Sequence, residues 1–228
     1  MESPTQFIKE TTTMAVYKHL KKLILTGQFR PGEWIRERQV KELLDVSSTP
    51  VREALRMLVQ EGILVSVPHR GVRLKILSKK ELQDFYELRS EVEGLAARLA
   101  AARRTEAQCK KMDDLLKITE IKLNNSSDFG TDAADYNNAF HDLIAEASNN
   151  QALINSLSKM RTEVNLLRVM LWKSEKQRPI TTLNQHRLIF QAIAEKDSHL
   201  ARQRIREHIE DSAKLVLRVA EKALNKEN

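Results

Sequence analysis

The fold of the N-terminal part of this chain is decided by residues 47–55, which read SSTPVREAL. Thr49 is a favourable N-cap residue, and Pro50 suits the first helical position because its missing N–H would have no partner there. The stretch therefore predicts that a helix begins at this point. Gly62 is expected to end it, since glycine readily takes the left-handed conformation that follows many helices.

This helix is expected to have two unlike faces. Apolar residues recur at i, i+4, i+7 and i+8 and form one buried stripe, namely Val51, Leu55, Leu58 and Val59. Arg52 and Arg56 stand one turn apart on the opposite face. A helix with one packed face and one cationic face is suited to enter a DNA groove. An isolated pair of arginines is more often a solvated helix face, so the neighbouring segments must decide between the two interpretations.

Those neighbouring segments favour the DNA interpretation. Residues 36–44 predict a shorter helix, and residues 45–48 make the turn of a helix-turn-helix. Residues 63–67 and 71–75 are short β-rich runs with a turn between them, which indicates a wing. At its tip Gly71 would let a backbone come close to a phosphate or to the minor groove.

Three segments, residues 24–33, 46–55 and 61–64, resemble the N-terminal domain of GntR-family bacterial transcription regulators. The resemblance implies that the recognition helix and the wing tip contact a palindromic DNA operator as a homodimer. We expect those contacts from Arg38, Ser47, Ser48, Thr49, Arg52, Arg56, His69, Arg70 and Gly71. Ser48 stands where the family usually has an arginine, so a side chain that could read guanine is absent and the operator preference should differ.

Composition limits the classes of protein that fit. The 228 residues carry a net charge of +7, and residues 1–77 hold 13 Lys and Arg against 8 Asp and Glu, compared with 25 against 23 in the remainder. The positive field therefore lies on the N-terminal part, as phosphate contact requires. No membrane-spanning run or signal peptide is recognisable, so we expect a cytoplasmic protein. The single cysteine, Cys109, excludes an intrachain disulfide and is expected as a surface or half-buried thiol.

The sequence after residue 77 holds almost no glycine or proline, so it is expected to be helical. We expect helices over residues 78–103, 105–125, 131–148, 150–175, 180–195 and 197–225. The first of them carries an apolar stripe that could serve both the core and an exposed seam, formed by Leu82, Phe85, Leu88, Val92, Leu95 and Leu99.

The predicted fold is mainly α and has two domains. Residues 1–10 are expected to form a flexible tail. A winged helix-turn-helix with a small β-hairpin should occupy residues 11–77 and open with a helix over residues 11–28. An all-α helical bundle should occupy residues 78–228 and serve effector binding and dimerisation.

Three histidines on three different predicted bundle helices suggest a metal site. Asn137 and His141 are spaced i and i+4, so they share one helix face. His186 and His208 have apolar residues on their faces and should point inward. Any one of them alone is more often a core histidine satisfied by a hydrogen bond. Three imidazoles with one amide oxygen favour a divalent transition metal, with zinc or nickel the first expectation.

The same residues resemble the FCD domain of the FadR subfamily, through residues 137–141, residues 184–193 and His208. Many such domains hold a divalent metal through an aspartate or asparagine and three histidines, and bind a small carboxylate beside it. The resemblance implies an effector contact from Arg89, with Arg161 and Arg168 as further expectations. The alternative for Arg89 is an ordinary surface pair with Glu93. Because Asn137 replaces the commoner aspartate, the protein ligand set should be neutral.

Three functions are compatible with the winged helix-turn-helix and the three histidines to different degrees. The first is a transcription regulator whose operator affinity is controlled by a small organic acid bound near the metal. The second is a metal-dependent hydrolase, but no acidic residue is recognisable as a general base for the three histidines and no nucleophile motif is present. The third is a DNA-binding protein without metal or ligand response, whose histidines are core residues. We expect the first and do not expect an enzyme.

Overall fold

The computed structural model describes residues 11–29, 32–125, 130–172 and 178–224. The chain forms two compact units, residues 1–76 and 77–228. The expected tail, residues 1–10, lies outside the described residues. None of the described helices is long and apolar enough to span a bilayer.

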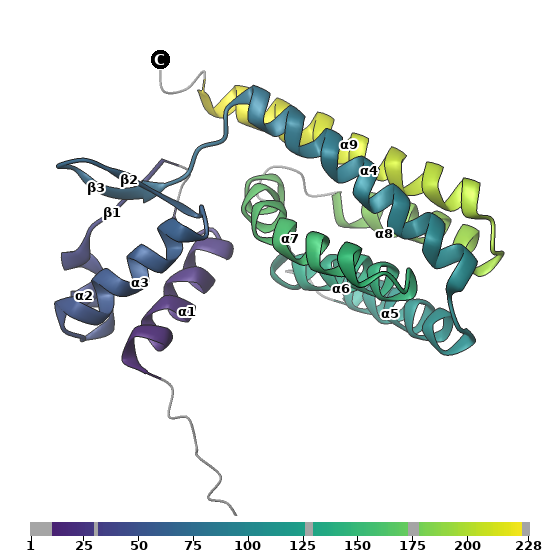
Figure 1. The fold of residues 1–228 in the computed structure, drawn as a ribbon, viewed down its shortest axis with the longest axis horizontal. Helices are drawn as coiled ribbons and strands as arrows, with labels where there is room; N and C mark the ends of the chain where they lie inside the picture. Colours follow the sequence, from purple (N-terminus) through teal and green to yellow (C-terminus); the bar gives the residue numbers. More distant parts are fainter. Residues whose placement is uncertain (1–10, 30–31, 126–129, 173–177, 225–228) are drawn as a thin grey trace, which may run out of the picture. The chain divides into compact units, whose positions relative to one another are not determined.

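The first unit contains three helices and a small sheet within its described residues (Figure 1). Its elements are α1 (Thr12–Leu25), β1 (Trp34–Ile35), α2 (Glu37–Leu44), α3 (Ser48–Gln60), β2 (Leu64–Val67) and β3 (Gly71–Leu74). The sheet is antiparallel in the order β1-β3-β2, and Val67 pairs with Gly71 at the wing tip. The hairpin was predicted, whereas the two-residue strand β1 was not.

Helices α1 and α3 pack on one another and form the core of this unit. Leu20 and Ile24 of α1 are fully buried, as are Val51 and Leu58 of α3. The predicted apolar stripe of α3 is therefore confirmed, although Val59 is only half-buried. Burial of this stripe fixes which side of α3 turns outward.

The start of α3 corrects the sequence prediction. Ser47, not Thr49, is the N-cap residue, with extended backbone angles of φ −70° and ψ 168°. Pro50 is then the third helical residue, where its missing N–H still costs no helical bond because the first four N–H groups have no intrahelical acceptor. Asp45 takes the left-handed conformation that closes α2 and turns the chain into α3.

The second unit is helical throughout its described residues. Its helices are α4 (Lys79–Arg103), α5 (Glu106–Asn125), α6 (Gly130–Ala147), α7 (Gln151–Trp172), α8 (Arg178–Ala194) and α9 (Ser198–Leu224). Each helix begins and ends within three residues of the bounds that the sequence predicted. Helices α4 and α9 run side by side along their lengths (Figure 1). Gly94 permits this approach, since a Cβ there would lie 3.2 Å from Cγ of Arg206.

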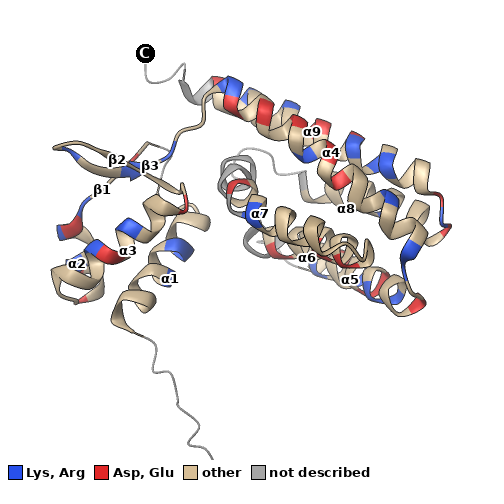
Figure 2. Ribbon diagram, in the orientation of Figure 1, with Lys and Arg blue, Asp and Glu red and all other residues tan. Residues whose placement is uncertain are grey.

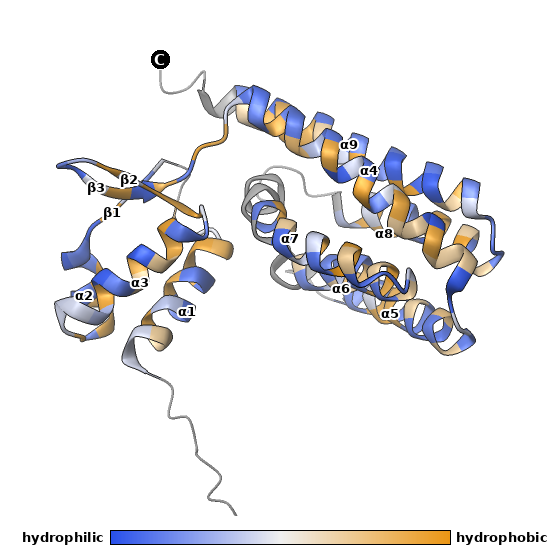
Figure 3. Ribbon diagram, viewed as in Figure 1, coloured by the Kyte–Doolittle hydropathy of each residue, from blue (hydrophilic) through white to orange (hydrophobic). Residues whose placement is uncertain are grey.

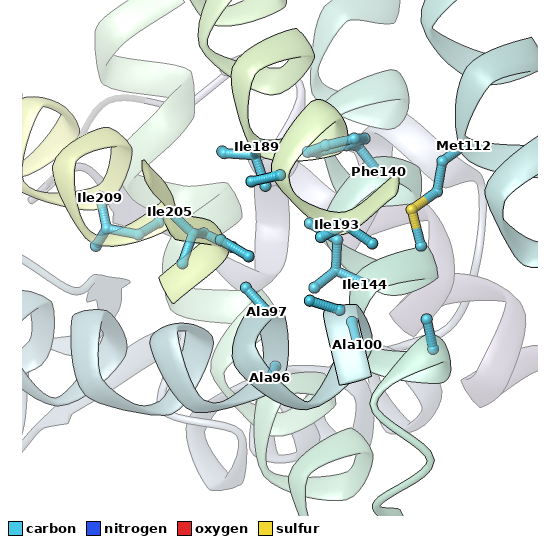
Figure 4. Close-up of a cluster of buried hydrophobic side chains, with 14 of the residues drawn as sticks. Ala96, Ala97, Ala100, Met112, Phe140, Ile144, Ile189, Ile193, Ile205 and Ile209 are labelled. Carbon is cyan, nitrogen blue, oxygen red and sulfur yellow. The ribbon is translucent and has the colours of Figure 1, made fainter. Parts of the chain in front are cut away.

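Hydrophobic side chains from several helices meet in one core (Figure 4). Phe140 and Ile144 of α6 and Ile189 and Ile193 of α8 are almost completely buried there. Hydropathy follows the same division, with orange stripes alternating with blue along α4 and α9 (Figure 3). Cys109 is also buried, so the expected surface or half-buried position was wrong; burial raises the pKa of its thiol.

The apolar stripe of α4 is only partly a core stripe. Leu82 and Leu99 are buried, whereas Leu88 is 58% exposed. Phe85, Val92 and Leu95 are half-buried. The buried face of α4 also includes polar residues, among them Arg89 and Glu93.

A pair of variants in α8 tests this packing. Ile193 is fully buried and Leu188 is 47% exposed. We expect Ile193→Ala to lower the free energy of unfolding by about 2–5 kcal/mol, through lost transfer energy and the cavity left behind. Leu188→Ala should change it by less than about 0.5 kcal/mol, as for most surface substitutions. Urea denaturation followed by circular dichroism measures both, and equal effects would contradict the core assignment.

Candidate functional sites

The second unit brings together its three predicted histidines. His141 comes from α6, His186 from α8 and His208 from α9. One ring nitrogen of each lies within 4.8 Å of those of the other two. Asn137 is buried one turn before His141 on the same helix, as the i, i+4 spacing predicted. His19 and His199, in contrast, are exposed.

Neighbouring rings fix the cluster's geometry. Phe140 stacks on His186 with ring centroids 4.1 Å apart and an interplanar angle of 17°. The centroid of His141 lies 5.3 Å from those of both His186 and His208, and His186 and His208 are 4.9 Å apart. The rings therefore surround a common point instead of stacking on one another.

Hydrogen bonds orient two of the rings. Nδ1 of His208 lies 2.8 Å from Oε1 of Gln185, and Nδ1 of His141 contacts a carboxylate oxygen of Glu93. Since amide and carboxylate oxygens only accept, each Nδ1 carries a proton, and in the neutral ring Nε2 keeps the lone pair that can bind a metal. Nε2 of His141 is buried and has no hydrogen-bond partner among the described residues. A buried nitrogen of this kind is costly unless something binds it.

Glu93 was missed as part of this site. It lies on α4 and is buried together with Arg89, whose Nε donates to Oε1 of Glu93 at 2.6 Å. The two side chains are only 7% and 4% exposed, so the alternative of an ordinary surface pair was wrong. Burial by itself raises the pKa of Glu93, but the Arg89 guanidinium and His141 outweigh it and hold that pKa well below its usual range. Glu93 is therefore a buried carboxylate ion.

The donor chemistry fits a divalent transition metal. Three imidazoles match the ligands that such ions prefer, and Nε2 of His141 is available. Asn137, one turn before His141 on the same helix, is the expected source of an amide oxygen. Ligand atoms around one tetrahedral zinc ion lie about 3.4 Å apart, given bonds of about 2.0–2.1 Å, so a small inward shift of the rings would suffice. The expected ligand set is neutral, and a carboxylate outside that set, Glu93, contacts Nδ1 of His141.

The arginines expected to hold an effector lie beside the histidines. Arg89 and Arg161 line a cavity of about 30 Å³ together with His141. That volume suits about one water molecule. Arg161 pairs with Asp142, and burial raises the pKa of that carboxyl. The third candidate, Arg168, has a side chain that lies outside the described residues.

The first unit presents the predicted basic face (Figure 2). Arg52 and Arg56 are 64% and 73% exposed on α3, opposite its buried stripe. The face is less uniformly cationic than the sequence suggested, because each arginine has an acidic neighbour. Nε of Arg52 donates to Glu37 at 2.9 Å, Nη1 of Arg56 donates to Glu53 at 3.3 Å, and Arg38 pairs with Glu42 at 2.8 Å.

A groove lies between α3, β1 and the wing. Its volume is about 560 Å³, and its lining includes Arg36, Arg52, Arg56 and Arg70. Arg36 was not among the predicted contacts. The remaining predicted contacts surround the start of α3 and the wing tip: Ser47, Thr49, His69, Arg70 and Gly71 are exposed and Ser48 is half-buried. Gly71 has φ +102°, a conformation that glycine adopts without strain.

Both units match known families. Residues 12–74 match the model of bacterial regulatory proteins of the gntR family, and residues 84–211 match the FCD domain. The chain is 29% identical to the HTH-type transcriptional regulator YdhC of Bacillus subtilis, covering 100% of this chain and 98% of that protein. It is 30% identical to the Nta operon transcriptional regulator of Aminobacter aminovorans, covering 68% and 72%.

Two further relatives come from Escherichia coli. The transcriptional repressor RspR is 24% identical over 95% of this chain and 92% of its own length. The solved structure of McbR/YncC superimposes with a TM-score of 0.74 at 22% identity, covering 91% of this chain and 98% of that one. The structural likeness supports the fold, and the relatives are regulators of transcription. Those relatives confirm the expectation that the chain is not an enzyme.

Proposed function

This chain belongs to the gntR family of bacterial regulatory proteins and carries an FCD domain, and we propose that it is a repressor whose operator affinity is set by a small carboxylate bound beside a metal. The observation that carries the proposal is the buried histidine cluster, which lies in the same chain as a winged helix-turn-helix. Repression is the action named for RspR. Because the partner is bacterial DNA, we expect the protein to act in the cytoplasm.

The DNA part of the proposal rests on the exposed side of α3. Arg52 and Arg56 stand one turn apart on α3, and both side chains are more than half exposed. In a winged helix-turn-helix such a helix enters the major groove while the wing reaches the backbone. Phosphates would replace Glu37 and Glu53 as the partners of these arginines.

The effector part rests on the cavity beside His141. Arg89 and Arg161 are the cationic groups there, and both already hold an internal carboxylate. A bound divalent ion would supply additional positive charge that attracts an anion. Since the cavity has room for little more than one water molecule, an effector can enter only if side chains of α6 and α7 move apart. That requirement couples binding to a change of shape.

We further propose that the protein acts as a homodimer on a palindromic operator. Half-sites lie about 34 Å apart, so a change in the separation of two recognition helices would weaken or strengthen both contacts together. The exposed Leu88 on α4 is consistent with a seam on that helix.

Charge variants on the first unit test the DNA contact. We expect Arg52→Ala and Arg56→Ala each to weaken binding about tenfold, because each removes a groove contact. Glu37→Gln should strengthen binding, since it removes a carboxylate that competes with phosphate for Arg52. The measurement is fluorescence anisotropy with duplex DNA selected from a random pool, at several salt concentrations.

Arg187→Ala serves as the control, because Arg187 is an exposed arginine of the second unit that also pairs with a glutamate, Glu120. It should leave DNA affinity unchanged. Wild-type affinity for both Arg52→Ala and Arg56→Ala, or an affinity that does not fall with salt, would contradict the proposed interface.

Elemental analysis tests the metal. The protein purified after incubation with zinc or nickel should contain about one equivalent of ion, as expected for a single closed ligand set. The His141→Ala/His208→Ala variant should contain none, whereas His199→Ala, which alters an exposed histidine, should retain it. Equal metal content in all three proteins would mean that the ion binds elsewhere.

A further inference from the structure

The proposed function assigns no role to the buried carboxylate of Glu93. It is not among the predicted ligands, and one of its oxygens contacts Nδ1 of His141. Its two oxygens have different partners: Oε1 accepts from Nε of Arg89 at 2.6 Å, and Oε2 contacts Nδ1 of His141. Both partners lie on the cavity where the effector is proposed to bind.

We propose that Glu93 is a positioning residue that holds His141 ready for the metal and links this ligand to Arg89, so that the charge at Arg89 sets the strength of metal binding. This inference rests on the proposed function, because it concerns the same histidine site. It assigns to one buried carboxylate the connection between the metal and the effector arginine.

The orienting role follows from hydrogen-bond chemistry. A carboxylate can only accept, so the proton of the His141 ring is held on Nδ1 and Nε2 keeps the lone pair that binds metal. A carboxylate behind a histidine also makes the ring a stronger ligand. His208 receives the same orientation from Gln185, but from a neutral amide at 2.8 Å. The strength of His141 as a ligand therefore depends more on its partner than that of His208 does.

The linking role follows from the shared charge. Arg89 and Glu93 are both buried and neutralise one another. A divalent ion bound by the histidines would place two positive charges next to this neutral pair. The positive charge of Arg89 would repel the ion. Any change that weakens the ion pair between Arg89 and Glu93 therefore lets the negative charge of Glu93 stabilise His141 and its bound ion more strongly. An anion bound to Arg89 is such a change, and by linkage the metal would favour the anion equally.

Opposite effects of two variants test the proposal, with zinc affinity measured by competition against a chromophoric chelator. Glu93→Gln should weaken zinc binding about 10- to 100-fold. Its amide has one accepting oxygen for two donors, so the proton of His141 would move to Nε2 and block the lone pair. Arg89→Gln retains an N–H donor for Glu93 but removes the positive charge, and should strengthen zinc binding several-fold.

Three controls separate positioning from a loss of packing. Glu91→Gln removes a carboxylate from an exposed position of the same helix, where it pairs with Arg202 and Arg206, and should leave zinc affinity unchanged. Gln185→Leu should weaken binding less than Glu93→Gln does. In a His141→Ala background, Glu93→Gln should cause no further loss. Nitrogen NMR of the histidine rings should show the His141 proton on Nδ1 in the wild type and on Nε2 in Glu93→Gln.

The outcomes distinguish this inference from the proposed function. If Glu93→Gln and Arg89→Gln both weaken zinc binding, or neither changes it while the wild type binds zinc, the linking role is wrong and the metal site stands. If Glu93→Gln weakens binding equally with and without His141, Glu93 does not act through that histidine. A wild-type protein that binds no zinc or nickel would overturn both the inference and the metal site.

Discussion

The candidate site in the second unit depends on one buried ion pair, Arg89 with Glu93, whose carboxylate also accepts a hydrogen bond from Nδ1 of His141. Charges inside a helical bundle are tolerated only with close partners, and removing one partner leaves the other uncompensated. Arg89 and Glu93 lie on α4 and His141 lies on α6, so this contact fixes the register of two helices. That register sets the orientation of the His141 ring. It therefore also sets the direction in which the lone pair of Nε2 points.

Under the proposed function, the same contact would give the chain a means of regulation. Helix α4 is the first element after the wing in the sequence, and it carries both Arg89 and Glu93. A ligand that competes for Arg89 would therefore act on the helix that directly follows the winged unit in the sequence. The small cavity strengthens this argument, because an effector larger than a water molecule has to displace side chains to enter. A ligand shifts a protein between two conformations only if it binds one of them more tightly than the other.

Much of the fold could be predicted from the sequence. The helices of the bundle and the hairpin follow from helical spacing and turn residues, and the three histidines could be identified because apolar neighbours turn them inward. Other features depend on tertiary context. An i, i+4 pair such as Arg89 and Glu93 has the same pattern whether it is exposed or buried, so its burial was missed. Strand β1 is too short for any periodicity, and Ser47 competes with Thr49 as the cap because both side chains suit that position.

Metal binding by the three clustered histidines, with support from Glu93, is the proposal on which the effector site rests. Anomalous diffraction at the zinc absorption edge, from crystals of the full chain grown with zinc, tests it most directly. We expect one peak about 2.0–2.1 Å from Nε2 of His141, His186 and His208, with Glu93 on Nδ1 of His141. Well-ordered histidine rings without a peak between them, in crystals that hold zinc at other positions, would contradict it.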